Sequence, residues 1–257
     1  ILKQFRTVKK NISIPVFSLV SPDSKGYYHW IIEELPKLKY FEKFIRPYEK
    51  NVKILIDANI PKWKIETLRL LGYTYPSDFL HHDDQGVNYS DFIYCSPIYY
   101  NSRSAFNRKA LIWLKNKMLK KIKDKEKPVK QVKRIYITRS DAKSKKIINK
   151  IELIKELKKY GFKIYKLSSM NFIKKIKLFY QAEIIVGSHG AGLLHSLFSK
   201  NCKIIELFSE GKKPNMYHAL SIIFKNSYSS IVCKNSLKRN CKDIYVNIKK
   251  LLNIIKN

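Results

Sequence analysis

The sequence predicts an α/β protein built from two lobes, each with a parallel β-sheet flanked by helices. Apolar strand-like runs alternate with amphipathic helix-like runs along most of the chain, which is typical of parallel sheets covered by helices. The 257 residues suit two lobes of about 100–130 residues each. A polar, lysine-rich stretch at 125–133 contains a proline and no apolar stripe, which is typical of an interdomain linker.

The first lobe, residues 1–124, alternates less regularly than the second. We expect strands near 14–20 and 52–56, helices near 28–44, 61–71 and 105–122, and short strands and turns over 76–101. Pro36 is expected to bend the first helix, because proline lacks the N–H that an interior helical position needs. Pro61 fits the first position of the second helix, and Gly72 fits its end.

The second lobe, residues 134–240, shows the alternation clearly. The expected elements are strands at 134–138, 162–167, 183–187 and 203–208, and helices that begin after 146, at Asn171 and at Gly190. This order predicts a Rossmann-like lobe, and two such lobes predict a cleft between them where ligands commonly bind. A closing helix within 241–257 is expected to pack back on the first lobe.

The formal net charge of +32 comes from 52 Lys and Arg against 20 Asp and Glu. Such a balance suits partners that carry phosphate, but only eight of the basic residues are arginines, the type that base readout and phosphate clamps favour. Three interpretations stay open: a lysine-biased surface of an AT-rich genome, weak attraction to anionic membrane or glycan, and dedicated nucleic-acid binding. With 45% hydrophobic residues, a disordered basic tail is excluded.

No apolar run approaches the about 18–20 residues of a membrane span, so the sequence excludes an integral membrane protein for this stretch of chain. The chain begins without methionine, which leaves open a segment or anchor upstream. Its four cysteines lie far apart without C-x-x-C spacing. They predict reduced thiols of a cytoplasmic protein rather than a zinc site or disulfide framework. The lysine-rich surface leaves open a peripheral location at a membrane.

A glycine-rich stretch at 187–192 lies between a buried strand and a short helix. Its glycines let the backbone approach a ligand, and a helix start directs N–H groups at an anion such as a diphosphate. A tight turn that needs glycine is the alternative, although such a turn does not require His189 beside it. The stretch lacks the Gly-Lys-Ser/Thr of a Walker A loop, and Val186 stands where a nucleophile elbow needs glycine.

Two other stretches carry side chains suited to chemistry. His29 and Glu33 share one face of the predicted helix, where an imidazole and a carboxylate can pass a proton; a solvated helix start is the alternative. Arg139 follows the first strand of the second lobe, where ligands of parallel sheets bind, so it is a candidate phosphate clamp. At 81–84 we expect a polar loop rather than a metal site, and no D-x-D triplet occurs in the chain.

Taken together, these blocks resemble those of glycosyltransferase family 61. The matching blocks are 27–38 (YYHW, hydrophobic, acid, LP), 137–142 (SRSDA), 147–149 with Glu152 (a weakened RxxxNE), 187–193 and 204–208 (HGAGL…viELf), and 215–220 (YYxxLA). They keep the family's order from residue 27 to about residue 228, so the resemblance covers most of the chain. Members include transferases of capsular polysaccharides, xylan-decorating xylosyltransferases and protein O-linked N-acetylglucosaminyltransferases.

The resemblance implies a GT-B-like architecture, with the acceptor on the side of the first lobe and the donor bound by the second. It implies an inverting transfer of a monosaccharide from a nucleotide sugar, expected to be a UDP sugar, without metal or other cofactor. The expected acceptor is a capsular, lipopolysaccharide or related surface glycan, which can be lipid-linked. A non-catalytic scaffold of a polysaccharide assembly and a basic nucleic-acid-binding protein stay open as alternatives.

The resemblance also implies roles for single residues. Glu33, aided by His29, would be the base that deprotonates the acceptor hydroxyl; the family usually shows aspartate at that position, so Glu34 is the second candidate. The residues implied for donor binding are Arg139, Ser140, His189, Gly190, Ala191, Gly192, Glu206, Asn215 and Tyr217.

Overall fold

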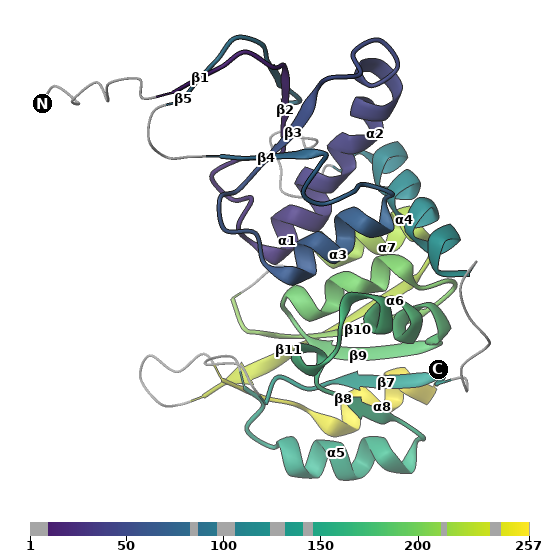
Figure 1. Cartoon of the computed structure of the whole chain (residues 1–257). Helices are drawn as coiled ribbons and strands as arrows, with labels where there is room; N and C mark the ends of the chain where they lie inside the picture. The colour runs from purple at the N-terminus through teal and green to yellow at the C-terminus, as the bar shows by residue number, and fades with distance from the viewer. Residues whose placement is uncertain are drawn as a thin grey trace, which may run out of the picture. The chain divides into compact units, whose positions relative to one another are not determined.

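The computed structural model describes residues 10–82, 87–96, 106–123, 132–140, 146–211, 215–236 and 243–256. The chain divides into two compact units, Ile1–Asp124 and Lys125–Asn257, each with its own parallel sheet (Figure 1). The predicted α/β class with parallel sheets is therefore confirmed. Most of the predicted linker at 125–133 lies outside the described residues.

The first unit is built on a four-stranded parallel sheet with the order β4-β3-β2-β6. Its strands are β2 (Val16–Ser18), β3 (Lys53–Ile56), β4 (Phe79–His81) and β6 (Phe92–Tyr94), and a separate parallel pair is formed by β1 (Lys10–Ile12) and β5 (Val87–Tyr89). The order places β3 and β4 on one side of β2 and β6 on the other. The strand order therefore reverses beside β2, and ligands of such sheets bind outside the carboxyl ends at that point.

The chain that leaves β2 enters a helical segment over residues 27–45, close to the predicted 28–44, but the segment is irregular. It runs through α1 (Tyr27–His29), a π turn η1 (Trp30–Glu34), a 3₁₀ turn η2 (Leu35–Lys37), α2 (Leu38–Tyr40) and a second π turn η3 (Phe41–Ile45). Pro36 lies in the 3₁₀ turn, where its missing N–H explains the interruption. Single π turns occur frequently at functional sites.

Two longer helices complete the first unit, α3 (Lys62–Leu70) and α4 (Arg108–Lys123). Pro61 is the N-cap residue of α3 with extended backbone, so the expectation of proline at the first helical position is off by one residue. Gly72, with φ +91°, ends the helix as predicted.

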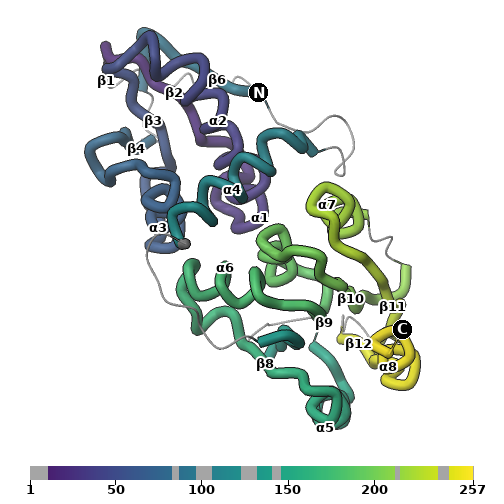
Figure 2. Tube along the Cα trace, turned by 90° about the vertical axis from the view of Figure 1, so that its right-hand side faces the viewer, coloured from purple at the N-terminus to yellow at the C-terminus, as the bar shows by residue number. Residues whose placement is uncertain are grey.

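The second unit has a six-stranded sheet with the order β12-β11-β10-β9-β7-β8, parallel except for the β11–β12 pair. Its strands are β7 (Arg134–Ile137), β8 (Lys163–Tyr165), β9 (Ile184–Ser188), β10 (Lys203–Ser209), β11 (Ser227–Asn235) and β12 (Ile244–Tyr245). Its helices are α5 (Lys150–Lys159), the 3₁₀ turn η4 (Leu167–Ser169), α6 (Phe172–Gln181), the 3₁₀ helix η5 (Ala191–Phe198), α7 (Met216–Phe224) and α8 (Ile248–Lys256). Figure 2 gives a second view of the same elements.

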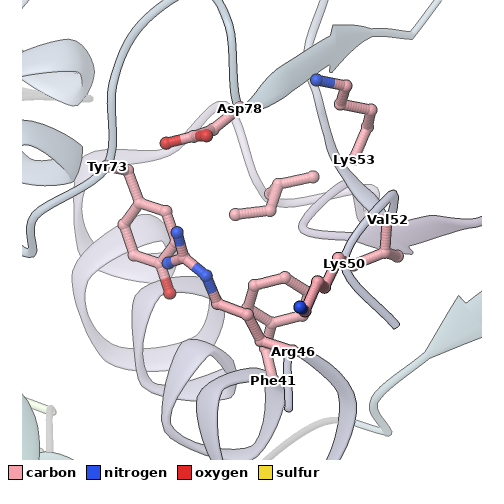
Figure 3. A pocket seen from close by; sticks show the side chains of 8 residues that line it. Phe41, Arg46, Lys50, Val52, Lys53, Tyr73 and Asp78 are labelled. Atoms are coloured by element: carbon pink, nitrogen blue, oxygen red, sulfur yellow. The ribbon is translucent and has the colours of Figure 1, made fainter. Parts of the chain in front are cut away.

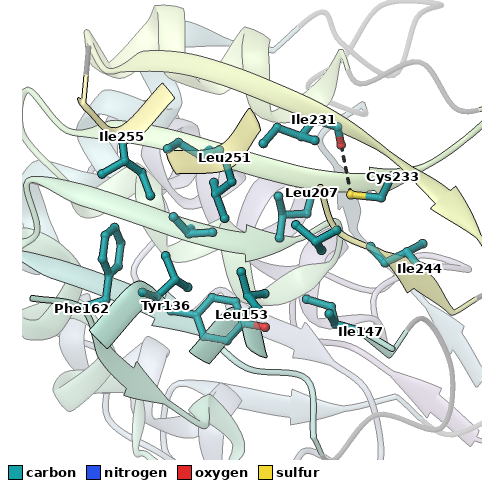
Figure 4. Packing of buried hydrophobic residues seen from close by; sticks show 14 residues of the cluster. Tyr136, Ile147, Leu153, Phe162, Leu207, Ile231, Cys233, Ile244, Leu251 and Ile255 are labelled. Carbon is teal, nitrogen blue, oxygen red and sulfur yellow. Dashed lines mark hydrogen bonds between the residues drawn. The ribbon is translucent and has the colours of Figure 1, made fainter. Parts of the chain in front are cut away.

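Both faces of this sheet are covered, α5 and α8 lying on one face and α6 and α7 on the other (Figure 1). The core on the first face joins side chains of β7, β9, β10 and β11 to Leu153 and Leu157 of α5 and to Leu251 and Ile255 of α8 (Figure 4). The α8 helix therefore contributes to the core of the second unit, and the expectation that it also packs back on the first lobe stays a prediction. The apolar side chains Leu251 and Ile255 of α8 are buried against the sheet of the second unit.

Within the part of the chain that the structure describes, no helix has the length and apolar character that a bilayer crossing needs. Asn171 caps α6 as predicted, since its side-chain oxygen accepts a hydrogen bond from the Lys174 backbone N–H at 2.8 Å.

Candidate functional site

In the second unit the strand order reverses between β7 and β9, because β8 lies on one side of β7 and β9 to β11 lie on the other. The predicted glycine-rich stretch leaves β9 at this point, and Arg139 follows β7 beside it. Carboxyl ends of parallel strands at such a reversal form the usual ligand site of doubly wound sheets. The topology therefore brings together two stretches that lie 50 residues apart in the chain.

Position 190 requires glycine for two reasons, its backbone conformation and the close approach of Arg139. Its φ of +152° is a conformation that L side chains rarely adopt, and a Cβ built there would lie 2.0 Å from Arg139 Nη1. The same guanidinium nitrogen donates a hydrogen bond of 3.2 Å to the His189 carbonyl oxygen. The glycine thus lets Arg139 lie directly against the loop, so the tight turn is present, and the ligand-binding role of the loop stays a prediction.

His189 is held by a buried carboxylate. Its Nδ1 lies 2.5 Å from Glu206 Oε1, and Glu206 is fully buried on β10. The second carboxylate oxygen, Oε2, accepts a hydrogen bond of 2.6 Å from the Tyr228 hydroxyl. Burial, followed by the hydrogen bond to Glu206, raises the pKa of Tyr228, so this hydroxyl stays protonated and donates. One third of the His189 side chain is exposed, and Nε2 is the ring nitrogen left for a ligand.

Three buried polar atoms at the same edge lack a hydrogen-bond partner among the described residues. They are Thr138 Oγ1, Arg139 Nε and Ser188 Oγ, at the carboxyl ends of β7 and β9. Leaving a buried donor or acceptor unpaired costs about 1–3 kcal/mol, so native proteins rarely do it without reason. These unpaired groups make this edge of the sheet a candidate ligand site.

The remaining predicted donor residues lie in three kinds of surroundings. Tyr217 is buried, and its hydroxyl donates to the Gly190 carbonyl oxygen at 2.6 Å, so it braces the loop from behind. Ser140, Ala191 and Asn215 are exposed, Ala191 at the start of η5 and Asn215 at the N-cap of α7. Gly192 lies at the close approach of η5 to β7, since a Cβ there would lie 3.3 Å from Ile137.

In the first unit, His29 and Glu33 form the pair that their spacing predicts. His29 Nδ1 lies 2.8 Å from Glu33 Oε2, with 36% of the histidine side chain and 12% of the glutamate side chain exposed. The other carboxylate oxygen, Oε1, has no hydrogen-bond partner among the described residues. A carboxylate with one oxygen oriented and the other available is suited to accept a proton.

Glu34, the second candidate base, is engaged inside the protein. Its Oε2 lies 2.7 Å from Lys37 Nζ in an ion pair of which both side chains are buried, and its Oε1 accepts from Ser21 Oγ at 2.8 Å. Burial raises the pKa of Glu34, while Lys37 and Ser21 act to lower it. Both oxygens are occupied, so Glu34 holds the turn in place instead of facing a substrate.

A second buried network fixes the other side of this segment. Trp30, the first residue of the π turn, donates from Nε1 to Thr67 Oγ1 at 3.0 Å, and the Lys64 ammonium lies 4.3 Å from its ring centre. Lys64 pairs with Asp57 at 2.7 Å, and Asp57 also accepts from Ser24 Oγ at 2.9 Å. The carboxyl end of β3 therefore clamps the helix that carries His29 and Glu33.

The predicted polar loop at 81–84 is described in part. His81 binds the Asp57 carbonyl oxygen and the Tyr75 hydroxyl, each at 3.2 Å, and Asp83 and Asp84 lie outside the described residues. Over the described ranges, no group of three or more His, Cys, Asp and Glu side chains could hold a metal ion. Cys202 and Cys233 are buried free thiols, and Cys95 is half-buried and free.

Sequence reasoning missed Ser188, Thr138 and Tyr228. Thr138 and Ser188 lie inside the quoted blocks 137–142 and 187–193, and they could have been singled out as polar residues at the ends of two strands. Tyr228 had no local signal, because its contact with Glu206 depends on the pairing of β10 with β11.

The family model of glycosyltransferase 61 matches residues 27–205. A comparison with curated proteins gave no match. Among solved structures, the chain is similar to the heptosyltransferase WaaC of E. coli with ADP, at 13% identity and a TM-score of 0.40, over 96% of this chain and 97% of that one. The family match spans well over half of the chain and includes the π turn, Arg139 and the glycine-rich loop, and the chain belongs to glycosyltransferase family 61.

Proposed function

We propose that this glycosyltransferase moves a monosaccharide from a nucleotide sugar, a UDP sugar, to a hydroxyl of a glycan acceptor, with inversion and without a metal ion or other cofactor. The observation that carries the donor part is the His189–Glu206 pair beside a glycine loop with three unsatisfied polar atoms. Surface glycans such as capsule or lipopolysaccharide are the acceptors we propose, and contact with an anionic membrane is part of the same proposal.

On the donor side, the second unit supplies positive groups for a diphosphate. As the bond between the anomeric carbon and the diphosphate oxygen breaks, its electron pair passes to the leaving group, which gains negative charge. Arg139 and the N–H groups at the start of η5 lie where they would stabilise that charge. When His189 carries both protons, Nδ1–H donates to Glu206 and Nε2–H is available to a diphosphate oxygen.

On the acceptor side, we assign the base to Glu33. Its free Oε1 would take the proton of the acceptor hydroxyl, whose oxygen then attacks the anomeric carbon from the face opposite the diphosphate. His29 holds Oε2 and fixes the orientation of the carboxylate. Glu34 is no longer proposed as a base, because both of its oxygens are bound within the protein.

The test is binding of UDP and of a panel of UDP sugars, measured by thermal shift and calorimetry. His189→Ala and Arg139→Ala should each abolish UDP binding while the protein stays folded. Lys174→Ala removes an exposed cation from the same unit and is the matched control, which should bind UDP like the wild type. Unchanged UDP affinity in both site variants would refute the assignment. A wild-type chain that binds no nucleotide sugar would favour the non-catalytic scaffold.

A further inference from the structure

A pocket lies in the first unit, away from the residues assigned to catalysis. Its volume is about 60 Å³, and it opens at the edge of the sheet where β3 and β4 begin. The segment with His29 and Glu33 leaves the carboxyl end of β2, which in a parallel sheet is the opposite edge. The side chains that matter here are the rings of Phe41 and Tyr73 and the charged groups of Arg46, Lys50, Lys53 and Asp78 (Figure 3).

The charges around this pocket favour an anion. Three cations stand against one carboxylate, and Asp78 Oδ2 already accepts a hydrogen bond of 2.6 Å from the Thr74 backbone N–H. The Arg46 guanidinium lies beside the Tyr73 ring, 5.5 Å from its centre, as Figure 3 shows. Among the described residues, the side chains of Arg46 and Lys50 have no hydrogen bond or ion pair. Their donors are therefore free for the oxygens of a phosphate.

The segment that supplies Phe41 and Arg46 also exposes aromatic rings. Phe44 is 54% exposed and Tyr48 is 85% exposed, and the Lys43 ammonium lies 4.8 Å from the Phe44 ring centre. Exposed aromatic side chains beside lysines are typical of a membrane–water interface, where the ring enters the headgroup layer and the cation meets phosphate.

We propose that residues 41–50 and the adjoining pocket seat this chain on an anionic lipid surface, with a headgroup phosphate held by Arg46 and Lys50. Charge complementarity supports this occupant, because the chain carries +32 and anionic lipids draw basic side chains to the surface. The pocket would add a specific binding site to this general electrostatic attraction between the basic chain and anionic lipids. The proposal rests on the membrane contact included in the proposed function and names the residues that make it; because it concerns binding alone, vesicle binding tests it separately from the transferase reaction.

The test is co-sedimentation of the full chain with vesicles, comparing neutral phosphatidylcholine with mixtures that contain phosphatidylglycerol. The wild type should sediment with the vesicles that contain phosphatidylglycerol and should not sediment with the neutral vesicles. Arg46→Gln with Lys50→Gln should lower the partition coefficient about 30-fold, from about 1 kcal/mol for each basic residue at the surface. The control removes the same charge from exposed lysines of the second unit, Lys155→Gln with Lys163→Gln, and should change binding about twofold at most.

Equal losses in the two double variants would overturn the proposal, since the attraction would then follow net charge alone. Wild-type binding that does not depend on phosphatidylglycerol would overturn it as well. A further arm adds inorganic phosphate without vesicles: a thermal shift that Arg46→Gln with Lys50→Gln removes, together with no vesicle binding, would assign the pocket to a soluble phosphate instead. Phe44→Ser with Tyr48→Ser changes exposed side chains only, so the fold is kept, and this variant should lose the part of vesicle binding that survives high salt.

Discussion

Replacing Gly190 by alanine tests the contact on which the donor loop depends. The new Cβ would lie 2.0 Å from Arg139 Nη1, so the guanidinium must move and give up its hydrogen bond to the His189 carbonyl oxygen. An L residue at φ +152° adds backbone strain of about 1–3 kcal/mol, and a lost hydrogen bond from a charged donor costs about 1.5–3 kcal/mol. Because the arginine can swing away, we expect a total near the lower end, about 3 kcal/mol.

The assay is a double-mutant cycle in urea, read as free energy of unfolding, with UDP affinity measured on the same samples. In the Arg139→Ala background the clash is absent, so Gly190→Ala should cost only its backbone strain. Gly161→Ala is the control for strain without contact, because φ there is +77° and no atom lies within 4 Å of the added Cβ. An equal cost of Gly190→Ala in both backgrounds would refute the reasoning.

Three further predictions concern single side chains. Tyr228→Phe leaves one oxygen of the buried Glu206 carboxylate unpaired and should lower kcat more than it changes KM and shift the pH profile of kcat; an unchanged profile would reduce Tyr228 to a packing role. Glu34→Gln should destabilise the fold by about 3–5 kcal/mol, because the Lys37 charge is left buried without its partner. Glu33→Gln should abolish turnover and leave both stability and UDP binding unchanged. The reverse pattern would restore Glu34 as a base. Burial, followed by nearby Lys175, lowers the pKa of His195 to about 3. Between about pH 6.5 and pH 3, the unfolded chain therefore binds a proton at this histidine that the folded chain does not. The free energy of unfolding should fall with decreasing pH in this range, by at most about 1.4 kcal/mol per pH unit. His195→Gln should flatten that slope in urea titrations at several pH values, and an equal slope in both proteins would contradict it.

The parts that the sequence predicted well are those encoded by neighbouring residues. The glycine loop with His189 and the His29–Glu33 spacing are local patterns, and the structure shows both as expected. The repeated alternation of strands and helices gave the α/β class for the same reason. Each of these features needs only the period of a helix or strand and the conformational freedom of glycine.

The parts that were missed depend on pairing at long range or on burial. Tyr228 reaches Glu206 because β10 and β11 pair with Ile204 opposite Tyr228, which puts both polar side chains on one face two residues apart. Glu34 stayed a second candidate beside Glu33 because a sequence does not show which of two adjacent carboxylates turns inward to Lys37. The apolar stripe of α8 indicated burial without saying which sheet would cover it.

The geometry of the candidate site depends on the number of residues in the π turn at Trp30–Glu34. A π turn closes over five residues where an α turn closes over four, so it holds one residue more than an α turn at the same place would. Each residue advances an α-helix by about 100°, so deleting one residue here would rotate everything on one side of the deletion by that amount. His29 would then lose its register with the carboxylate, or Trp30 its place against Thr67. Natural and engineered variants of this chain should therefore keep the number of residues in the turn.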